Sequence, residues 1–125
     1  MSGPIRVVLV EDNKVFREAL ELLLGLRADV EVVGSVDSGN VAAAMCRELV
    51  PDVVLMDYRL PGMNGVQATE AIREACPTTK VVCLTASVTR REVDALYEAG
   101  VVAVLTKDEE LDEIIGTIQR AADGS

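Results

Sequence analysis

Five short apolar runs, separated by stretches of helical periodicity, constrain the fold of this chain more than any other feature. The predicted strands cover residues 5–10, 30–33, 53–57, 80–85 and 101–106. The predicted helices cover about residues 13–26, 38–50, 65–75 and 89–100, with a last one from residue 108 to near the chain end. Runs of this kind are typical of strands buried on both faces of a parallel sheet. The pattern therefore predicts an α/β protein with one doubly wound, five-stranded parallel sheet.

The order of the strands follows from how such units connect. Right-handed crossovers in a (βα)5 chain favour the flavodoxin-like strand order 2-1-3-4-5. In that order the first and third strands are neighbours, and their carboxyl ends border the crevice where open α/β sheets bind ligands. Polar side chains that directly follow these strands are therefore the first candidates for a functional site.

Several helix ends are marked by local signals. Asn64 with Gln67, and Thr89 with Glu92, have the spacing of capping boxes. Gly100 predicts a helix stop. The residues Leu60-Pro61-Gly62 predict a tight turn, and Asp108 predicts the N-cap of the last helix. The first helix carries these apolar residues at helical spacing: Val15, Ala19, Leu22, Leu23 and Leu26.

Composition and charge exclude several classes of function. At 125 residues the chain is expected to form one domain, over residues 1–125. The formal charge of -9 argues against nucleic-acid or anionic-membrane binding, because phosphate contacts require clustered cations. No apolar run approaches the about 18 residues of a transmembrane helix. The chain contains no histidine, which excludes histidine-based catalysis and histidine–metal sites.

The three cysteines, Cys46, Cys76 and Cys83, lack the spacing of a metal site. Cys83 lies in an apolar run and is expected to be buried as a small hydrophobic residue. Free thiols suit a reducing compartment, so the sequence predicts a cytoplasmic protein.

Polar residues follow four of the five predicted strands. They are Glu11 and Asp12, Asp57, Thr85, and Lys107. Three carboxylates in one crevice repel one another unless a cation joins them, and Mg²⁺ commonly binds one or two carboxylates while it keeps water ligands. A hydroxyl and an ammonium opposite these acids suit a phosphoryl group. Asp57 would then be the nucleophile that forms an aspartyl-phosphate.

At this point the residues resemble a known family. The motifs are Leu9-Val10-Glu11-Asp12-Asn13, residues 55–65 around Asp57, Leu84-Thr85-Ala86 and Leu105-Thr106-Lys107-Asp108. In this order and spacing they are similar to the receiver domain of two-component response regulators, across the whole chain. Aspartate rather than proline after Lys107 resembles the NarL/FixJ-type subgroup.

The resemblance implies a role for each matching residue. Asp57 would accept a phosphoryl group from a sensor histidine kinase or from a small donor such as acetyl phosphate. Mg²⁺ would be bound by Asp12, Asp57 and the backbone carbonyl of Arg59, with Glu11 acting through water. Thr85 and Lys107 would contact phosphoryl oxygens after the transfer. Backbone N–H groups at Tyr58 and Ala86 would complete the phosphoryl site.

The resemblance also implies an output and further partners. Regulators of this subgroup continue into a helix-turn-helix domain that controls transcription, and we expect no output domain in this chain. Receivers dock a partner or a second receiver on the face made by the fourth helix, fifth strand and fifth helix, which makes a homodimer one expected partner. The chain departs from the family at Val104, where a tyrosine or phenylalanine usually moves inward with the threonine. Switching through that ring is therefore not expected here.

Three other functions compete with this interpretation. A haloacid-dehalogenase-like phosphatase also uses aspartate, Mg²⁺, a hydroxyl and lysine, but it needs an acid two residues after the nucleophile, where this chain has Arg59. We therefore expect a phosphoacceptor rather than a turnover enzyme. A flavodoxin-like cofactor carrier needs a phosphate-binding first loop, which Glu11 and Asp12 oppose. The third alternative is a receiver-like interaction module that is never phosphorylated.

Overall fold

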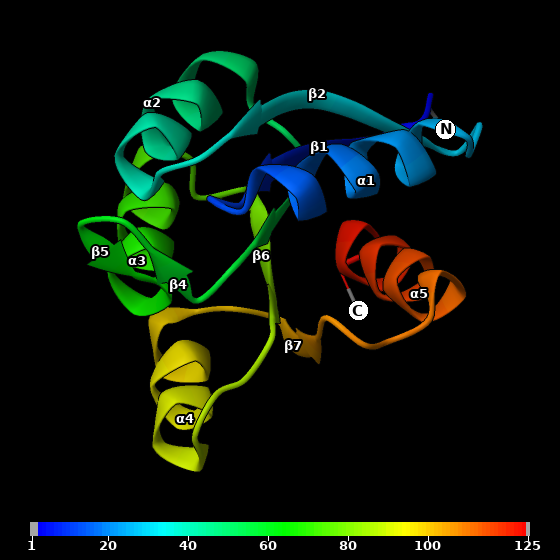
Figure 1. Ribbon diagram of the computed structural model, residues 1–125. Helices are drawn as coiled ribbons and strands as arrows, with labels where there is room; N and C mark the ends of the chain where they lie inside the picture. Colours follow the sequence, from blue (N-terminus) through cyan, green and yellow to red (C-terminus); the bar gives the residue numbers. More distant parts are fainter. Residues whose placement is uncertain (1–2, 125) are drawn as a thin grey trace.

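Five parallel strands form the central sheet of the computed structural model, which describes residues 3–124 (Figure 1). They are β1 (Ile5–Val10), β2 (Val30–Val36), β3 (Val53–Met56), β6 (Lys80–Thr85) and β7 (Ala103–Thr106). Their order across the sheet is β2-β1-β3-β6-β7, and all four pairings are parallel. The labels β4 (Arg59–Leu60) and β5 (Met63–Asn64) belong to a separate two-stranded hairpin. The sheet order is therefore the predicted 2-1-3-4-5, and the fold class is confirmed.

Helices cover both faces of this sheet (Figure 1). One face carries α1 (Lys14–Gly25) and α5 (Leu111–Ala122), and the other carries α2 (Gly39–Leu49), α3 (Gly65–Ala75) and α4 (Arg90–Ala99). Because side chains alternate along a strand, β3 sends Val54 and Met56 into one hydrophobic core and Val53 and Leu55 into the other. All four are buried, as their apolar run predicted.

The predicted helix caps are largely confirmed. Both side-chain and backbone bonds of a capping box are present at Asn64 with Gln67 and at Thr89 with Glu92. Gly100 ends α4 with φ of 114°, a left-handed conformation that side chains disfavour. The expected cap at Asp108 is wrong, because α5 begins only at Leu111 and the Asp108 carboxylate instead accepts a hydrogen bond from the Thr106 hydroxyl.

Three strands have other limits than predicted. The third strand ends at Met56, one residue earlier than expected. The second strand continues through Gly34 to Val36, with an irregular pairing to β1 after Val7. Gly34 stays in the strand because α2 packs directly over it: a Cβ at this position would collide with the Met45 side chain. The last strand begins at Ala103, two residues later than predicted. All three cysteines are free and buried, which confirms the expectation for Cys83.

The first helix forms where predicted, but its buried face is a different one. Leu20 and Leu24 pack into the core, whereas Val15, Leu22 and Leu26 are 79%, 69% and 75% exposed. Apolar residues at helical spacing occur on two faces of this helix, and the sheet covers only one. Within the described residues no helix is long and apolar enough to cross a membrane.

The loop after β3 folds into a hairpin that the sequence indicated only as a turn. Strands β4 and β5 pair antiparallel around Pro61 and Gly62, and Gly62 has φ of 79°. The chain then enters α3 at Gly65, close to the Tyr58 backbone. A Cβ on Gly65 would lie 2.9 Å from the Tyr58 Cα, nearer than real Cβ atoms come. Only glycine allows α3 to start this near to β3.

We expect Gly65→Ala to destabilise the protein by about 1–3 kcal/mol, because the added methyl group must displace backbone rather than a flexible side chain. Gly25→Ala is the matched control, since nothing lies within 4 Å of a Cβ at that helical position. The control should be neutral or more stable by up to about 1 kcal/mol. Urea unfolding of both variants measures the difference, and equal stabilities would contradict the close approach at Gly65.

Candidate functional site

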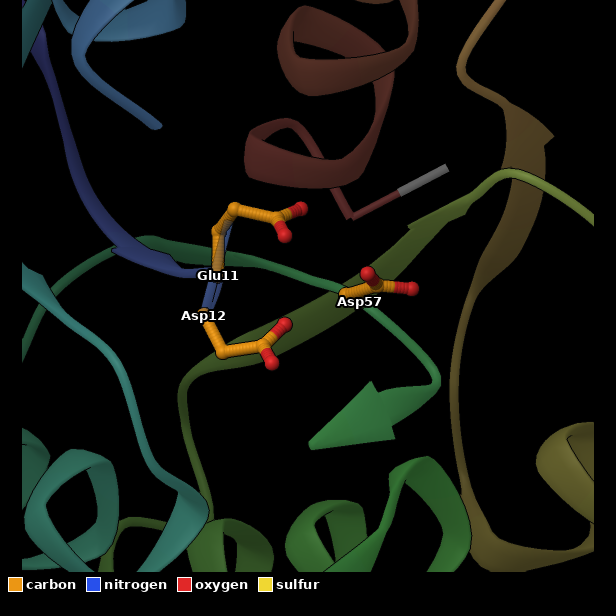
Figure 2. A group of neighbouring side chains, drawn as sticks. All are labelled: Glu11, Asp12 and Asp57. Carbon is orange, nitrogen blue, oxygen red and sulfur yellow. The ribbon is translucent and has the colours of Figure 1, made fainter. Parts of the chain in front are cut away.

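The carboxyl ends of β1 and β3 bring three carboxylates together. Glu11 and Asp12 follow β1, and Asp57 follows β3, where its backbone N–H donates to the Val10 carbonyl at 3.0 Å. One oxygen from each carboxylate lies within 4.8 Å of the other two, and Figure 2 shows the three side chains gathered at this edge of the sheet. Glu11 and Asp57 are buried and Asp12 is exposed. The predicted convergence of these acids is confirmed.

Lys107 lies against two of these carboxylates. Its Nζ atom is 2.8 Å from Glu11 Oε1 and 3.0 Å from Asp57 Oδ2. The ammonium also lies 4.5 Å from the centre of the Phe16 ring, within the range of a cation–π contact. The backbone N–H of Lys107 donates to the Thr85 carbonyl at 2.9 Å, which fixes β7 beside β6 at this point. The side chain is thus held from both ends over the acidic cluster.

Burial and the Lys107 ammonium shift the pKa of Glu11 in opposite directions. Burial raises the pKa of the Glu11 carboxyl, and the nearby Asp57 carboxylate raises it further. The hydrogen bonds from Lys107 and from the Asn13 backbone lower this pKa, but the net shift is upward. For Lys107, burial favours the neutral amine, but the bonds to Glu11 and Asp57 outweigh it and raise the pKa of the ammonium. The lysine therefore stays charged, and it only partly offsets the cost of burying Glu11.

The other predicted site residues lie nearby in the fold. Thr85 is the last residue of β6, is 1% exposed, and is joined to Lys107 through the backbone bond described above. The backbone N–H of Arg59 donates to Asp57 Oδ1 at 3.4 Å. Its guanidinium turns away, to the Ser87 carbonyl at 3.5 Å and to Glu92 Oε1 at 3.3 Å.

Three contacts at the site were not foreseen from the sequence. They are the ion pair of Lys107 with Glu11, the ring of Phe16 over that ammonium, and the ion pair of Arg59 with Glu92. The position of Glu11 and Lys107 at the ends of strands in one sheet could have indicated the first. The other two depend on side-chain directions in α1, in β4 and in the first turn of α4, for which the sequence carries no signal.

The chemistry of the cluster is set by its donors. Carboxylate oxygens are hard ligands, and their number and partial exposure suit a divalent cation that keeps several waters. Asp57 offers a buried carboxylate whose two oxygens face different neighbours, the Arg59 N–H and the Lys107 ammonium. Val104, which stands where an aromatic residue was expected, is a half-buried residue of β7 and packs against the core on the α4 side of the sheet.

A family model described as the response regulator receiver domain matches residues 7–119. The chain belongs to the response regulator receiver family. This match includes every acid of the cluster, Thr85 and Lys107. Receiver domains of this family are phosphoacceptor domains, and the homologues described next are regulators of the LuxR/NarL type, as the motif around Lys107 predicted.

Known proteins support the same assignment along the whole receiver. The chain is 34% identical over 120 residues to the transcriptional regulatory protein LiaR of Bacillus subtilis, and equally to the response regulator protein VraR of Staphylococcus aureus. Each match covers 96% of this chain and 57% of the relative, so the chain spans little more than half the length of these regulators. The signal receiver domain of NarL from Mycobacterium tuberculosis has a TM-score of 0.93 and 34% identity, and the match covers 99% of this chain and 100% of that one.

Replacing Lys107 with methionine is expected to lower the stability of the metal-free receiver at neutral pH by on the order of 2 kcal/mol, because two buried carboxylates lose their shared ammonium. Folding raises the pKa of Glu11 above its ordinary value of 4.5. Protonated Glu11 therefore stabilises the folded protein fully below pH 4.5, and this contribution is lost as the pH rises through the pKa of Glu11 in the folded state. Without Lys107 that pKa rises further.

The difference between wild type and Lys107→Met should therefore be larger at about pH 7.5 than at about pH 4, where Glu11 is protonated and its pairing with Lys107 no longer contributes. Urea unfolding in the presence of a chelator measures it at both values. The exposed Lys14→Met is the control and should show little change at either pH. An equal loss for Lys107→Met at both pH values would contradict the charge pairing.

Proposed function

We propose that this receiver accepts a phosphoryl group on Asp57 and changes conformation in response. One observation supports this most: the Asp57 carboxylate is only 7% exposed, yet it lies within 4.8 Å of two further acids and 3.0 Å from an ammonium. A purely structural aspartate would not need so costly an arrangement. Burial raises the pKa of the neighbouring Glu11 carboxyl, and a perturbed carboxylate beside a charged partner is typical of functional sites.

The transfer joins an Asp57 carboxylate oxygen to the phosphorus of the donor. The bond between phosphorus and the nitrogen of a phosphohistidine breaks, and its electron pair leaves with the histidine ring. The Lys107 ammonium lies 3.0 Å from Asp57 Oδ2 and pairs with the attacking group. A phosphohistidine donor would belong to a partner, a sensor histidine kinase, since residues 1–125 contain no histidine.

The acidic cluster fits Mg²⁺. Asp12 and Asp57 would bind it directly, the Arg59 carbonyl would supply a third ligand, and Glu11 would act through water. When bound, Mg²⁺ neutralises charge on the phosphoryl oxygens as they approach the carboxylates. Asp12 is the exposed member of the cluster and leaves the ion accessible from solvent.

Lys107 and Thr85 would recognise the phosphorylated state. Before the transfer the Lys107 ammonium is shared between Glu11 and Asp57. A phosphoryl group on Asp57 adds a charge of about −1.5 to −2 and three acceptor oxygens, which attract the same ammonium more strongly. The Thr85 hydroxyl, at the end of the adjacent β6, would bind another of these oxygens.

The site suits a phosphoacceptor better than a phosphatase. A haloacid-dehalogenase-like phosphatase needs a general acid two residues beyond the nucleophile. That position holds Arg59, whose guanidinium faces Glu92 instead. No atom of this side chain can donate and regain a proton near neutral pH. We therefore do not expect catalytic turnover of small phosphate esters.

We propose that residues 1–125 are one receiver and that it controls a DNA-binding output in the full-length regulator. The support is the description of LiaR as a transcriptional regulatory protein that is nearly twice as long as the match. The charge of -9 opposes DNA binding by the receiver itself, so a homodimer is the simpler route to an output. Free cysteines and a kinase partner support the proposal that the exchange takes place in the cytoplasm.

Intact mass after incubation with acetyl phosphate and Mg²⁺ tests the phosphorylation site. The wild type should gain one phosphoryl group, and Asp57→Asn should gain none, because an amide is not a nucleophile of this kind. Asp94→Asn, a variant of an exposed aspartate on α4, is the matched control and should be phosphorylated like the wild type. No adduct on the wild type, or an equal adduct on Asp57→Asn, would disprove the proposal.

Lys107→Ala separates phosphorylation from switching. This variant should still accept a phosphoryl group, since Lys107 is not the nucleophile, but its conformational response should weaken. Changes in tyrosine fluorescence and in oligomeric state before and after phosphorylation measure that response. A response equal to that of the wild type would show that Lys107 has no role in recognising the phosphoryl group.

A further inference from the structure

The two residues that follow Asp57 both lead to the start of helix α4. Arg59 places its guanidinium Nη2 atom 3.3 Å from Glu92 Oε1 and 3.5 Å from the Ser87 carbonyl. At its other end, the Arg59 backbone N–H donates to Asp57 Oδ1. One residue thus contacts the proposed phosphoacceptor through its backbone and the α4 region through its side chain.

Glu92 has a structural role of its own at this helix terminus. Its Oε1 atom accepts the backbone N–H of Thr89 at 2.8 Å, and its own N–H donates to the Thr89 hydroxyl at 3.1 Å. The N–H of Thr89 holds the pKa of the Glu92 carboxyl below its ordinary value, and Arg59 adds to this effect. The oxygen that caps α4 is therefore the oxygen that binds Arg59, so a change at Arg59 alters the cap directly.

Tyr58 joins the same elements through packing. Its ring is buried in the core that also contains Leu96 of α4. A Cβ on Gly65 would lie 3.1 Å from Tyr58 Cδ1 and 3.3 Å from Leu96 Cδ2, which shows that the ring fits between α3 and α4. The Arg59 guanidinium lies over this ring, 5.2 Å from its centre. Burial, followed by the Glu92 carboxylate, raises the pKa of Tyr58.

These contacts offer a route to α4 that does not need an aromatic residue in β7. Val104 has no ring to rotate, and it lies half-buried against the same core. Tyr58 and Arg59, by contrast, are the first and second residues after Asp57. Arg59 contacts the cap of α4 at Glu92, and Tyr58 lies in the same core as Leu96. Any shift of the backbone at Asp57 moves both side chains.

We propose that Tyr58 and Arg59 are positioning residues that couple the state of Asp57 to helix α4 through Glu92. This inference rests on the proposed phosphorylation of Asp57. The added negative charge attracts the Arg59 cation away from Glu92. The cap at Thr89 then loses its support, and the first turn of α4 opens more often. Helix α4 belongs to the face that we expect to bind partners, so its release changes that face.

Site-resolved amide hydrogen exchange of Thr89 and Glu92 tests the coupling. In the wild type, acetyl phosphate with Mg²⁺ should speed the exchange of both amides by about two- to fivefold, as expected for the loss of a partly exposed ion pair. In Arg59→Gln, both amides should already exchange at this faster rate before phosphorylation, and their rates should change little after it. Arg59→Lys, which keeps the charge, should restore part of the response.

Two further variants separate coupling from general damage to the fold. Glu92→Gln keeps an oxygen for the Thr89 cap but loses the charge. The double variant with Arg59→Gln should show the same amide exchange rates at Thr89 and residue 92 as Arg59→Gln alone. Arg91→Gln, an exposed arginine of the same helical turn, is the matched control and should respond like the wild type.

Intact mass on the same samples distinguishes failure of the inference from failure of the function. If wild type and Arg59→Gln are both phosphorylated but show the same change at Thr89 and Glu92, or no change, the coupling is wrong and the phosphoacceptor function stands. If the wild type takes up no phosphoryl group, both are wrong. Additive effects of the Arg59 and Glu92 variants would also overturn the coupling.

Discussion

The ammonium of Lys107 between Glu11 and Asp57 is the interaction on which the site depends. Two buried carboxylates at the end of neighbouring strands would repel each other, and burial alone already raises the pKa of Glu11. Lys107 lowers the free energy of burying the two carboxylates but does not cancel it, because one positive charge faces two acids. The site is therefore poised: a divalent cation or a phosphoryl group changes the balance of charge and redirects the same ammonium.

The parallel sheet is what makes this concentration of charge possible. Neighbouring strands β1, β3, β6 and β7 end at one edge of the sheet. Glu11, Asp57 and Lys107 directly follow β1, β3 and β7, and Thr85 is the last residue of β6. The cores on the two faces of the sheet connect the site to different helices. One packs α1 and α5 beneath Lys107 and Phe16, and the other links Tyr58 to α3 and α4. Our proposal is that a change at Asp57 reaches α4 through Tyr58 and Arg59, the two residues that follow it.

The sequence predicted the sheet order, most helix limits and the convergence of Glu11, Asp12 and Asp57, because these follow from long apolar runs and from the geometry of parallel strands. It failed where two local choices were equally good. Apolar residues on two faces of α1 fit the same period, and only packing on the sheet decides that Leu24 is buried and Leu22 exposed. The Asp108 carboxylate could accept a hydrogen bond either from the helix N–H groups or from the Thr106 hydroxyl, and in the structure it accepts from the hydroxyl. The β4–β5 hairpin is too short to leave a periodic pattern.

A crystal structure of the receiver with Mg²⁺ and beryllofluoride, a mimic of the phosphoryl group, tests the central claim most directly. The account predicts beryllofluoride on an Asp57 oxygen, Mg²⁺ bound by Asp12 and Asp57, and the Lys107 ammonium moved from Glu11 to a fluoride. A structure in which Asp57 carries no adduct while Lys107 still bridges Glu11 and Asp57 would contradict it.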